Sequence, residues 1–439
     1  MEKGLIFTYV LTYGGAVASL FNPFYGLLIY FCFAIVKPEA LWHWSVPVGN
    51  YSRIIGIALL LGWALQGFGN WDLRRSRPIV FILLGYFFWM ILSAANAQIS
   101  PTTAWGEVEA FAKILLPFLA GVTLIDSVAK IRLTAWVMVL SQGFVALQMN
   151  QTYYKNASFI SAMEEFGGMD NNSISIAMVC GAGLAFFLAM GETQWWKKLL
   201  CFACAVLMVH VPMFSMSRGG QLAILITGVV SFFLIPKQPK HYAVFAAAVI
   251  GALMLAGPEV RERFSSVFVD AEERDASADS RIELWKDCAE VMQDKPLFGV
   301  GPAHWPLVAS DFGWPHGKAA HSVWFETGAD LGVPGMALLL AFYLVTMWMM
   351  WKLARQPPLA EPWFADAGRM TVAAIVGFGV AASFVSLDAL ELPYYVVMLG
   401  ACSLKLSSFY EGSYQRPAVS YQRSAISNQP RATIPHPTR

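Results

Sequence analysis

The amino-acid sequence predicts an all-α polytopic membrane protein with about 12–13 transmembrane helices and one large extracytoplasmic loop. Two observations predict this fold class. The chain is 57% hydrophobic and only 13% charged, and its apolar runs reach the ~20 residues that cross a bilayer. Because an unpaired backbone group costs several kcal/mol in lipid, a chain of this pattern satisfies its backbone as helices. A soluble domain is therefore excluded.

The apolar runs follow one another with short connectors and then stop near Phe409. The predicted spans are 5–20, 23–38, 53–69, 78–95, 109–125, 131–149, 172–190, 199–216, 220–235, 241–257, 333–351, 369–387 and 392–409. The chain thus divides into N-terminal transmembrane helices (1–257), an extracytoplasmic catalytic loop (258–332), C-terminal transmembrane helices (333–409) and a tail (410–439). The tail is rich in Ser, Gln, Pro and Arg, so we expect it to be disordered and cytoplasmic.

Lysines and arginines in the short loops predict the orientation of the chain, because such loops stay in the cytoplasm. Basic residues fall on alternate connections, near 74–77, 130–132, 197–198, 237–240 and 352–355. The loops near 40–52, 96–108 and 150–171, together with the insert 258–332, then lie outside the cytoplasm. The formal net charge of +1 gives no indication of nucleic-acid binding.

The stretch from Asp279 to Gly335 carries an unusual concentration of charged residues and histidines for a sequence of this kind. Within it, Ser280 is a candidate cap for a helix through about Gln293. An apolar stripe follows at helical spacing, made of Leu284, Cys288, Val291 and Met292. We therefore expect an amphipathic helix that lies on the membrane surface or on the bundle.

Two polar motifs stand at predicted outer helix starts. In Ser217-Arg218-Gly219-Gly220, the arginine has a plain interpretation as a lipid-headgroup anchor. The glycines also favour a phosphate site, because they allow close approach to backbone N–H groups beside a guanidinium. In Asp170-Asn171-Asn172, helix capping explains one polar side chain. Three in a row exceed what one cap needs, so sugar binding is the alternative.

Histidines in the insert are candidates for acid–base chemistry. His316 and His321 are five residues apart, a spacing that suits neither one helical face nor a usual helical metal pair. No metal site is therefore expected, and one imidazole as general base is the better hypothesis. His304 is expected to be structural. The six cysteines give no disulfide framework.

Several motifs together resemble the O-antigen ligase and polymerase superfamily. They include the Ser217–Gly220 motif, Asp279-Ser280-Arg281 with Trp285, the segment 296–301 (Pro-Leu-Phe-Gly-Val-Gly), and His321-Ser322 leading to Glu326, Asp330-Leu331-Gly332 and Gly335. The Asp170–Asn172 motif and the N-terminal hydropathy are more similar to the superfamily's O-glycosylation ligase branch, which is associated with exosortase systems. The resemblance covers most of the chain up to about Phe409.

The resemblance implies a metal-independent glycosyltransferase of the GT-C type that needs no cofactor. Such an enzyme moves a glycan from undecaprenyl pyrophosphate to an acceptor, which is lipid A core, protein or another glycan. It would be a multi-pass protein of the bacterial inner membrane, surrounded by lipid, with its active site facing the periplasm. By this resemblance Arg218 and Arg281 bind the donor pyrophosphate and His321 activates the acceptor. Gly219, in the glycine-rich helix start, is expected to bind the same pyrophosphate. Ser322 departs from the family, in which many members carry Asn.

Other residues and other functions complete the sequence-based hypotheses. Glu326, Asp330 and His316 are candidates for supporting the base or binding sugar, together with the Asp170–Asn172 motif. Within the same chemistry, a polymerase that joins lipid-linked repeat units is the first alternative. A polysaccharide or lipid transporter is the second, but the few ionisable residues near the spans lie at their ends and no internal repeat is apparent.

Overall fold

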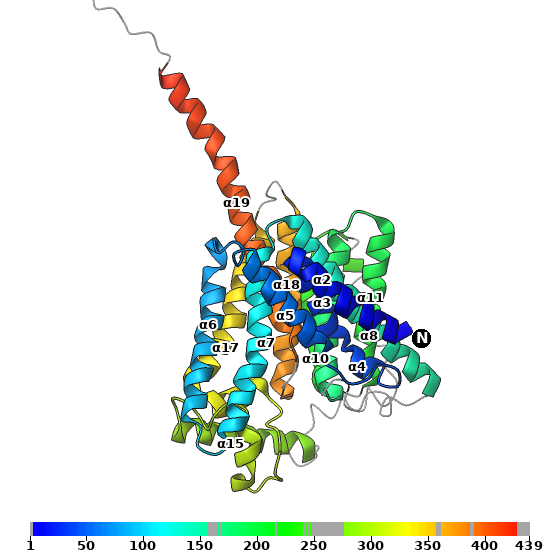
Figure 1. The fold of residues 1–439 in the computed structure, drawn as a ribbon, viewed down its shortest axis with the longest axis vertical. Coiled ribbons are helices and arrows are strands. Elements are labelled where there is room, and N and C mark those ends of the chain that lie inside the picture. Colours follow the sequence, from blue (N-terminus) through cyan, green and yellow to red (C-terminus); the bar gives the residue numbers. More distant parts are fainter. Residues whose placement is uncertain are drawn as a thin grey trace, which may run out of the picture.

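The computed structural model is an α-helical bundle (Figure 1). It describes residues 3–156, 166, 169–215, 217–239, 242–243, 246, 276–356, 361–386 and 390–427. Its α-helices are α1 (Lys3–Tyr9), α2 (Gly15–Phe21), α3 (Pro23–Val36), α4 (Pro38–Leu41), α5 (Tyr51–Leu65), α6 (Arg77–Asn96), α7 (Pro101–Leu124), α8 (Val128–Asn156), α10 (Asn171–Gly191), α11 (Trp195–Phe214), α12 (Arg218–Leu234), α15 (Ala276–Asp294), α16 (Trp305–Val308), α17 (Val323–Arg355), α18 (Trp363–Ala381) and α19 (Leu392–Ser427). A π-helical turn η1 (Val10–Gly14) joins α1 to α2, and the 3₁₀ turns are η2 (Arg74–Ser76), η5 (Ala309–Phe312) and η6 (Ala382–Phe384).

The predicted fold class is confirmed. Within the described part of the chain, nine helical segments are long and apolar enough to cross a membrane. The shorter apolar helices α5 and α12 and the 24-residue α7 coincide with three further predicted spans. The predicted span 241–257 lies almost entirely outside the described residues.

Helix α10 is the central helix of the bundle. It packs against α8, α11, α12 and α18, and its residues from Ser173 to Ala185 are all buried. The stretch is rich in Ala, Gly and Ser, and small side chains let helix backbones approach closely in a membrane bundle. Gly183 shows this, because a Cβ there would lie 3.0 Å from the backbone of Ala373 in α18. The polar start of α10 is thereby held among the ends of neighbouring helices.

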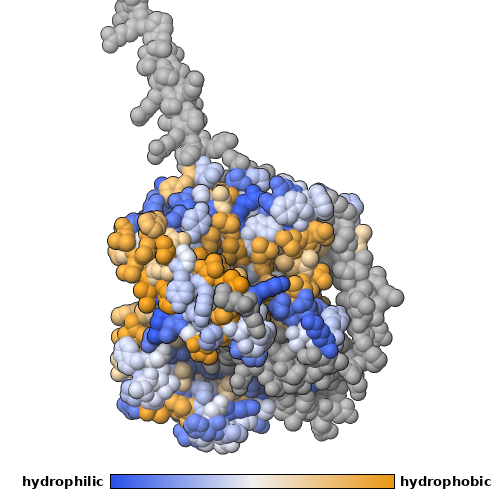
Figure 2. All heavy atoms as spheres, turned by 45° about the vertical axis from the view of Figure 1, so that its right-hand side comes forward, coloured by the Kyte–Doolittle hydropathy of each residue, from blue (hydrophilic) through white to orange (hydrophobic). Residues whose placement is uncertain are grey.

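The insert and the basic loops lie at opposite ends of the bundle. Figure 1 shows α15 at the bottom and the extension of α19 at the top. At the top, Arg75 forms an ion pair of 2.6 Å with Glu411 and connects η2 to α19. Lysine and arginine pack on tryptophan at the same end of α17, with Lys352 4.5 Å from the Trp348 ring. Figure 2 shows hydrophobic side chains over much of the bundle's side, with hydrophilic ones at the top and further ones in the middle and toward the bottom.

The amphipathic helix expected in the insert is present as α15. Leu284, Cys288 and Val291 are buried in a small separate core with Trp305 and Ala320, and α15 packs against α17. The helix begins at Ala276, so Ser280 lies inside it and does not cap it, contrary to the prediction.

Two expected boundaries differ from the structure. Helix α17 begins at Val323, ten residues before the predicted span at 333–351, and is kinked at Gly332. At the other boundary, α19 continues to Ser427 where a disordered tail was expected from residue 410. Extending an existing helix costs much less free energy than nucleating one, so weak periodicity alone does not end it. Residues 428–439 of the expected tail lie outside the described residues.

Candidate active site

The kink in α17 attaches the insert to the bundle. Gly332 has φ +72°, and a Cβ there would lie 2.3 Å from the carbonyl oxygen of Leu297. The kink frees two carbonyl groups of α17, and the glycine-rich loop 296–301 uses them. Val300 N–H donates to the Ala329 carbonyl and Gly301 N–H to the Asp330 carbonyl, both at 2.9 Å. The 296–301 motif therefore packs a loop against a broken helix.

Asp330 serves the same attachment through its side chain. Its Oδ1 accepts hydrogen bonds from the backbone N–H groups of His304 at 3.1 Å and Trp305 at 2.7 Å. His304 is fully buried; its Nε2 accepts from Ser100 N–H and its Nδ1 donates to the Pro302 carbonyl. His304 is thus structural, as predicted, and the structure places the Asp330 carboxylate at the start of α16 instead of beside the imidazole of His321.

His321 lies immediately before α17 in a left-handed backbone conformation, with φ +54°. Its N–H donates to Ser386 Oγ at 2.9 Å. The hydroxyl of Ser386 donates in turn to the Glu326 carboxylate, which also accepts from Ala320 N–H at 3.2 Å. Glu326 thus supports the backbone around His321 through Ser386. A left-handed conformation is unfavourable for residues other than glycine, and these hydrogen bonds hold it in place.

Charged groups surround the half-buried imidazole of His321. Burial lowers its pKa below the ordinary value, and the cationic side chains of Arg281 and Lys318 lower it further. The carboxylate of Asp170, at the start of α10, acts in the opposite direction and raises it. The net effect is a neutral imidazole near pH 7, which can accept a proton.

Helix α15 brings Arg281 to this place through Trp285, one helical turn further on. The indole N–H of Trp285 donates to the Ala320 carbonyl at 3.1 Å. Its ring stacks on Phe325 with centroids 5.4 Å apart. Residues four apart lie on the same helical face, so Arg281 faces the start of α17 as well.

The start of α12 approaches the same region through η6. Ser217 is the N-cap, and its Oγ accepts from Gly220 N–H at 3.2 Å. Arg218 is the first, exposed residue of α12. A Cβ on Gly219 would lie 3.0 Å from Phe384 Cβ, and the Phe384 ring is 6.3 Å from that of Trp285. Phe384 therefore bridges the arginine motif of α12 and the helix that carries Arg281.

The polar motif at the start of α10 behaves mainly as a helix start. Asp170 is the N-cap and accepts from Ser173 N–H at 2.7 Å. Asn171 donates to the Ser215 carbonyl at 3.1 Å, which fixes α10 to the end of α11. Asn172 donates weakly to its two neighbours, at 3.2 Å and 3.4 Å. The capping interpretation holds for Asp170, and the proximity of its charge to His321 adds a second role.

Two further residues singled out from the sequence, His316 and Ser322, make no side-chain hydrogen bond to the described groups around His321. His316 is exposed, in a turn of the insert where Gly317 N–H donates to the Pro306 carbonyl. Ser322 Oγ is buried and has no hydrogen-bond partner within the described residues. The same part of the chain contains no group of three or more His, Cys, Asp or Glu side chains suited to a metal ion.

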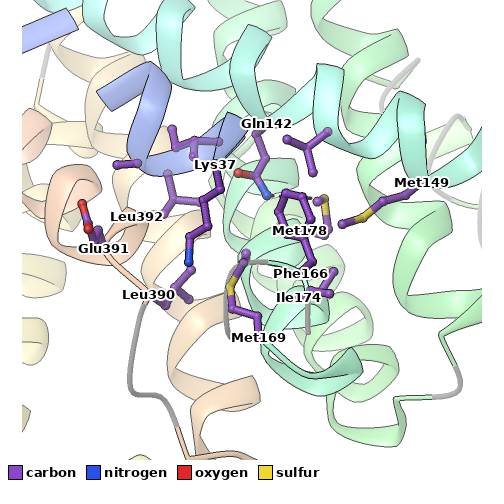
Figure 3. Close-up of a pocket in the computed structure, with 14 residues that line it drawn as sticks. Lys37, Gln142, Met149, Phe166, Met169, Ile174, Met178, Leu390, Glu391 and Leu392 are labelled. Carbon is purple, nitrogen blue, oxygen red and sulfur yellow. Dashed lines mark hydrogen bonds between the residues drawn. The ribbon is translucent and has the colours of Figure 1, made fainter. Parts of the chain in front are cut away.

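A small cavity lies next to the start of α10. Figure 3 shows Lys37 from the end of α3 reaching toward Met169, Leu390 and Leu392. The accessible volume is about 20 Å³, close to the space that one water molecule occupies. This cavity is too small for a sugar.

Sequence reasoning did not find Ser386 or the positioning role of Trp285. Ser386 has no local motif, and it contacts His321 from 65 residues further along the chain. Trp285 was noted only as part of a motif, and its hydrogen bond to Ala320 crosses 35 residues. Both roles depend on contacts between segments that are distant in the sequence, so no local pattern shows them.

Together, the fold and site define a polytopic helical membrane protein whose candidate site is assembled from helix ends beside an extramembrane insert. Residues 203–340 match the family model described as O-antigen ligase (Wzy_C), over a stretch that runs from α11 into α17. The match supports the O-antigen ligase superfamily and, with it, an O-antigen ligase- or polymerase-like membrane enzyme. The exosortase-associated branch stays a prediction. No curated protein matches the chain.

Proposed function

We propose that the protein transfers a glycan from undecaprenyl pyrophosphate to a hydroxyl group of an extracytoplasmic acceptor, without a metal ion. One observation carries the proposal: Ser386 holds the backbone of His321 at the start of α17, and Arg281 lies near enough to the half-buried imidazole to lower its pKa. A neutral base beside a fixed guanidinium suits a reaction that removes a proton from one substrate and generates negative charge on another.

The reaction assigns a role to each group. The acceptor oxygen attacks the anomeric carbon of the donor sugar while its proton passes to His321. The bond from that carbon to the pyrophosphate oxygen breaks, and undecaprenyl pyrophosphate leaves with the bonding electrons. Arg218 and Arg281 bind the leaving pyrophosphate as planar donors matched to paired oxygens. Gly219 allows the phosphate to approach the N–H groups at the start of α12.

The site would face the periplasm from the bacterial inner membrane. This orientation is supported by the positions of the basic connections and the insert at opposite ends of the bundle. Fusions of a periplasm-specific reporter and a cytoplasm-specific reporter after Gln356 test it. Activity of only the cytoplasmic reporter is expected, and activity of only the periplasmic one would reverse the orientation.

The donor is tested by following consumption of undecaprenyl-pyrophosphate-linked glycan in membranes. Arg281→Lys keeps the charge but loses the paired donors, so turnover should fall by about tenfold to a thousandfold. Lys286→Ala, an exposed change on the same helix, is the matched control and should leave turnover unchanged. Normal turnover in both Arg218→Lys and Arg281→Lys would contradict the pyrophosphate site.

The acceptor is identified from the product of the same assay. Mass spectrometry that finds glycan on lipid A core or protein supports a ligase. A lengthened glycan still attached to undecaprenyl pyrophosphate would instead identify the enzyme as a polymerase. A ligase product and a polymerase product are both compatible with the donor site and the base that we propose.

A further inference from the structure

A groove between α8 and α11 lies apart from the candidate residues described above. Its volume is about 510 Å³, far larger than the cavity beside Lys37. Its wall is apolar on the side toward the starts of the two helices, where Leu147 of α8 and Val206 and Leu207 of α11 line it. Val206 is 67% exposed although it lies in a helix of membrane-spanning length. An apolar groove on two such helices opens toward lipid chains.

The outer end of the groove is polar. Asn150 uses both amide hydrogens on backbone carbonyls, those of Ala146 at 2.7 Å and Leu207 at 3.1 Å. Its Oδ1 must therefore accept the 2.5 Å hydrogen bond from Nδ1–H of His210. That bond leaves Nε2 of His210 available to a ligand in the groove. Ionisable side chains inside membrane helices are costly and usually serve a function.

A cation and an aromatic ring complete this end. Tyr154 stacks on the His210 ring with centroids 5.9 Å apart and planes at 8°. Lys155 lines the groove beside it, at the exposed outer end of α8. The groove therefore offers apolar contacts within the bilayer and a positive charge at its outer boundary. This order matches a lipid whose phosphate lies at the outer surface.

A series of contacts leads from the groove to the candidate active site. Helix α11 rises about 6 Å from His210 to its last residue, Phe214, whose ring stacks on Tyr153 at 4.4 Å. The next residue, Ser215, binds the start of α10 through its carbonyl group and its hydroxyl. Arg218 follows at the start of α12. A lipid in the groove would thus have its head at the end of α11 that leads to the arginine motif.

We propose that this groove binds the isoprenoid chain of the lipid-linked donor, with the pyrophosphate directed toward Lys155 and Arg218. The inference rests on the proposed function for the identity of the lipid. It assigns α8 and α11 as the side from which the donor enters the site from the bilayer.

The test uses undecaprenyl pyrophosphate without a glycan, carrying a photoreactive diazirine in the isoprene unit nearest the phosphate. Irradiation with the full-length protein in phospholipid nanodiscs should label peptides of α8 and α11. Val206→Trp fills the groove and should reduce labelling about tenfold, the effect of losing roughly two methylene contacts. Leu344→Trp is the matched control, because Leu344 of α17 is 54% exposed. It should label as the wild type does.

Excess unlabelled undecaprenyl pyrophosphate should abolish the labelling, and excess phosphatidylglycerol should not. Labels that fall on other helices, that survive Val206→Trp, or that phosphatidylglycerol removes equally well would overturn the inference. Because the probe has no glycan, the result does not depend on turnover. Labelled α8 and α11 in a protein that never consumes the lipid-linked glycan would contradict the proposed function and leave the groove assignment standing.

Discussion

Replacing Asp330 with alanine should destabilise the protein through the backbone of the insert. The change removes Oδ1, which accepts from two N–H groups, at 3.1 Å and 2.7 Å. Both belong to fully buried residues, His304 and Trp305. An unsatisfied buried donor costs about 1–3 kcal/mol, so the loss should be roughly 2–6 kcal/mol. Asp330→Asn keeps the acceptor oxygen and should lose about 1 kcal/mol or less.

Thermal unfolding of the detergent-purified protein, followed by tryptophan fluorescence, measures the difference. Asp330→Ala should unfold at a clearly lower temperature than Asp330→Asn. Asp311→Ala removes an exposed carboxylate from the same insert and should change little. If the asparagine variant unfolds as early as the alanine variant, the acceptor role is wrong. Turnover in Asp330→Asn should stay near that of the wild type, since the carboxylate does not support the imidazole.

The remaining predictions concern the base and its surroundings. His321→Ala should reduce glycan transfer by about 10²–10⁴-fold while donor photolabelling persists, and His316→Ala should transfer almost normally; the reverse result would exchange the two histidines. The rate should rise with pH as His321 loses its proton. Lys318→Gln removes a cation that lowers the pKa of His321, so the acidic limb of the pH–rate profile should move to higher pH; Asp170→Asn should move it to lower pH. An unmoved limb in both variants would exclude His321 as the titrating group. Ser386→Ala should lower kcat roughly tenfold to a hundredfold with little change in KM for the donor, because misplacing the base affects mainly the chemical step; Ser386→Thr should restore much of the rate.

Much of the fold could be predicted because membrane helices are encoded locally. Apolar runs of spanning length located the helices. The basic loops on alternate connections indicated which connections share one end of the bundle. The apolar stripe of α15 was likewise visible from spacing alone. Boundaries set by other parts of the chain were not predictable. The start of α17 at Val323 depends on the kink at Gly332, whose freed carbonyls are satisfied by a loop some thirty residues earlier.

The candidate site could be predicted only in part. Arg218 and His321 stood out by residue type and position, and Arg281 was assigned through the family resemblance. Their support was not visible, since Ser386 and Trp285 act through contacts between distant segments. The role of Asp330 was misjudged for the same reason: nearness in sequence to His321 suggested a carboxylate–imidazole pair. A helix that begins between them carries the side chain to another partner.

The hydrogen bond from His321 to Ser386 has a consequence for biogenesis. Ribosomes deliver the chain from its N-terminus, so Arg218, Arg281 and His321 all emerge before Ser386. Until α18 and η6 have inserted, Ser386 cannot hold the left-handed turn at His321. A chain truncated after α17 would contain every residue assigned to the chemistry and still lack a positioned base. Under the proposed function, activity should therefore appear late in synthesis, and half-inserted chains should not consume the donor.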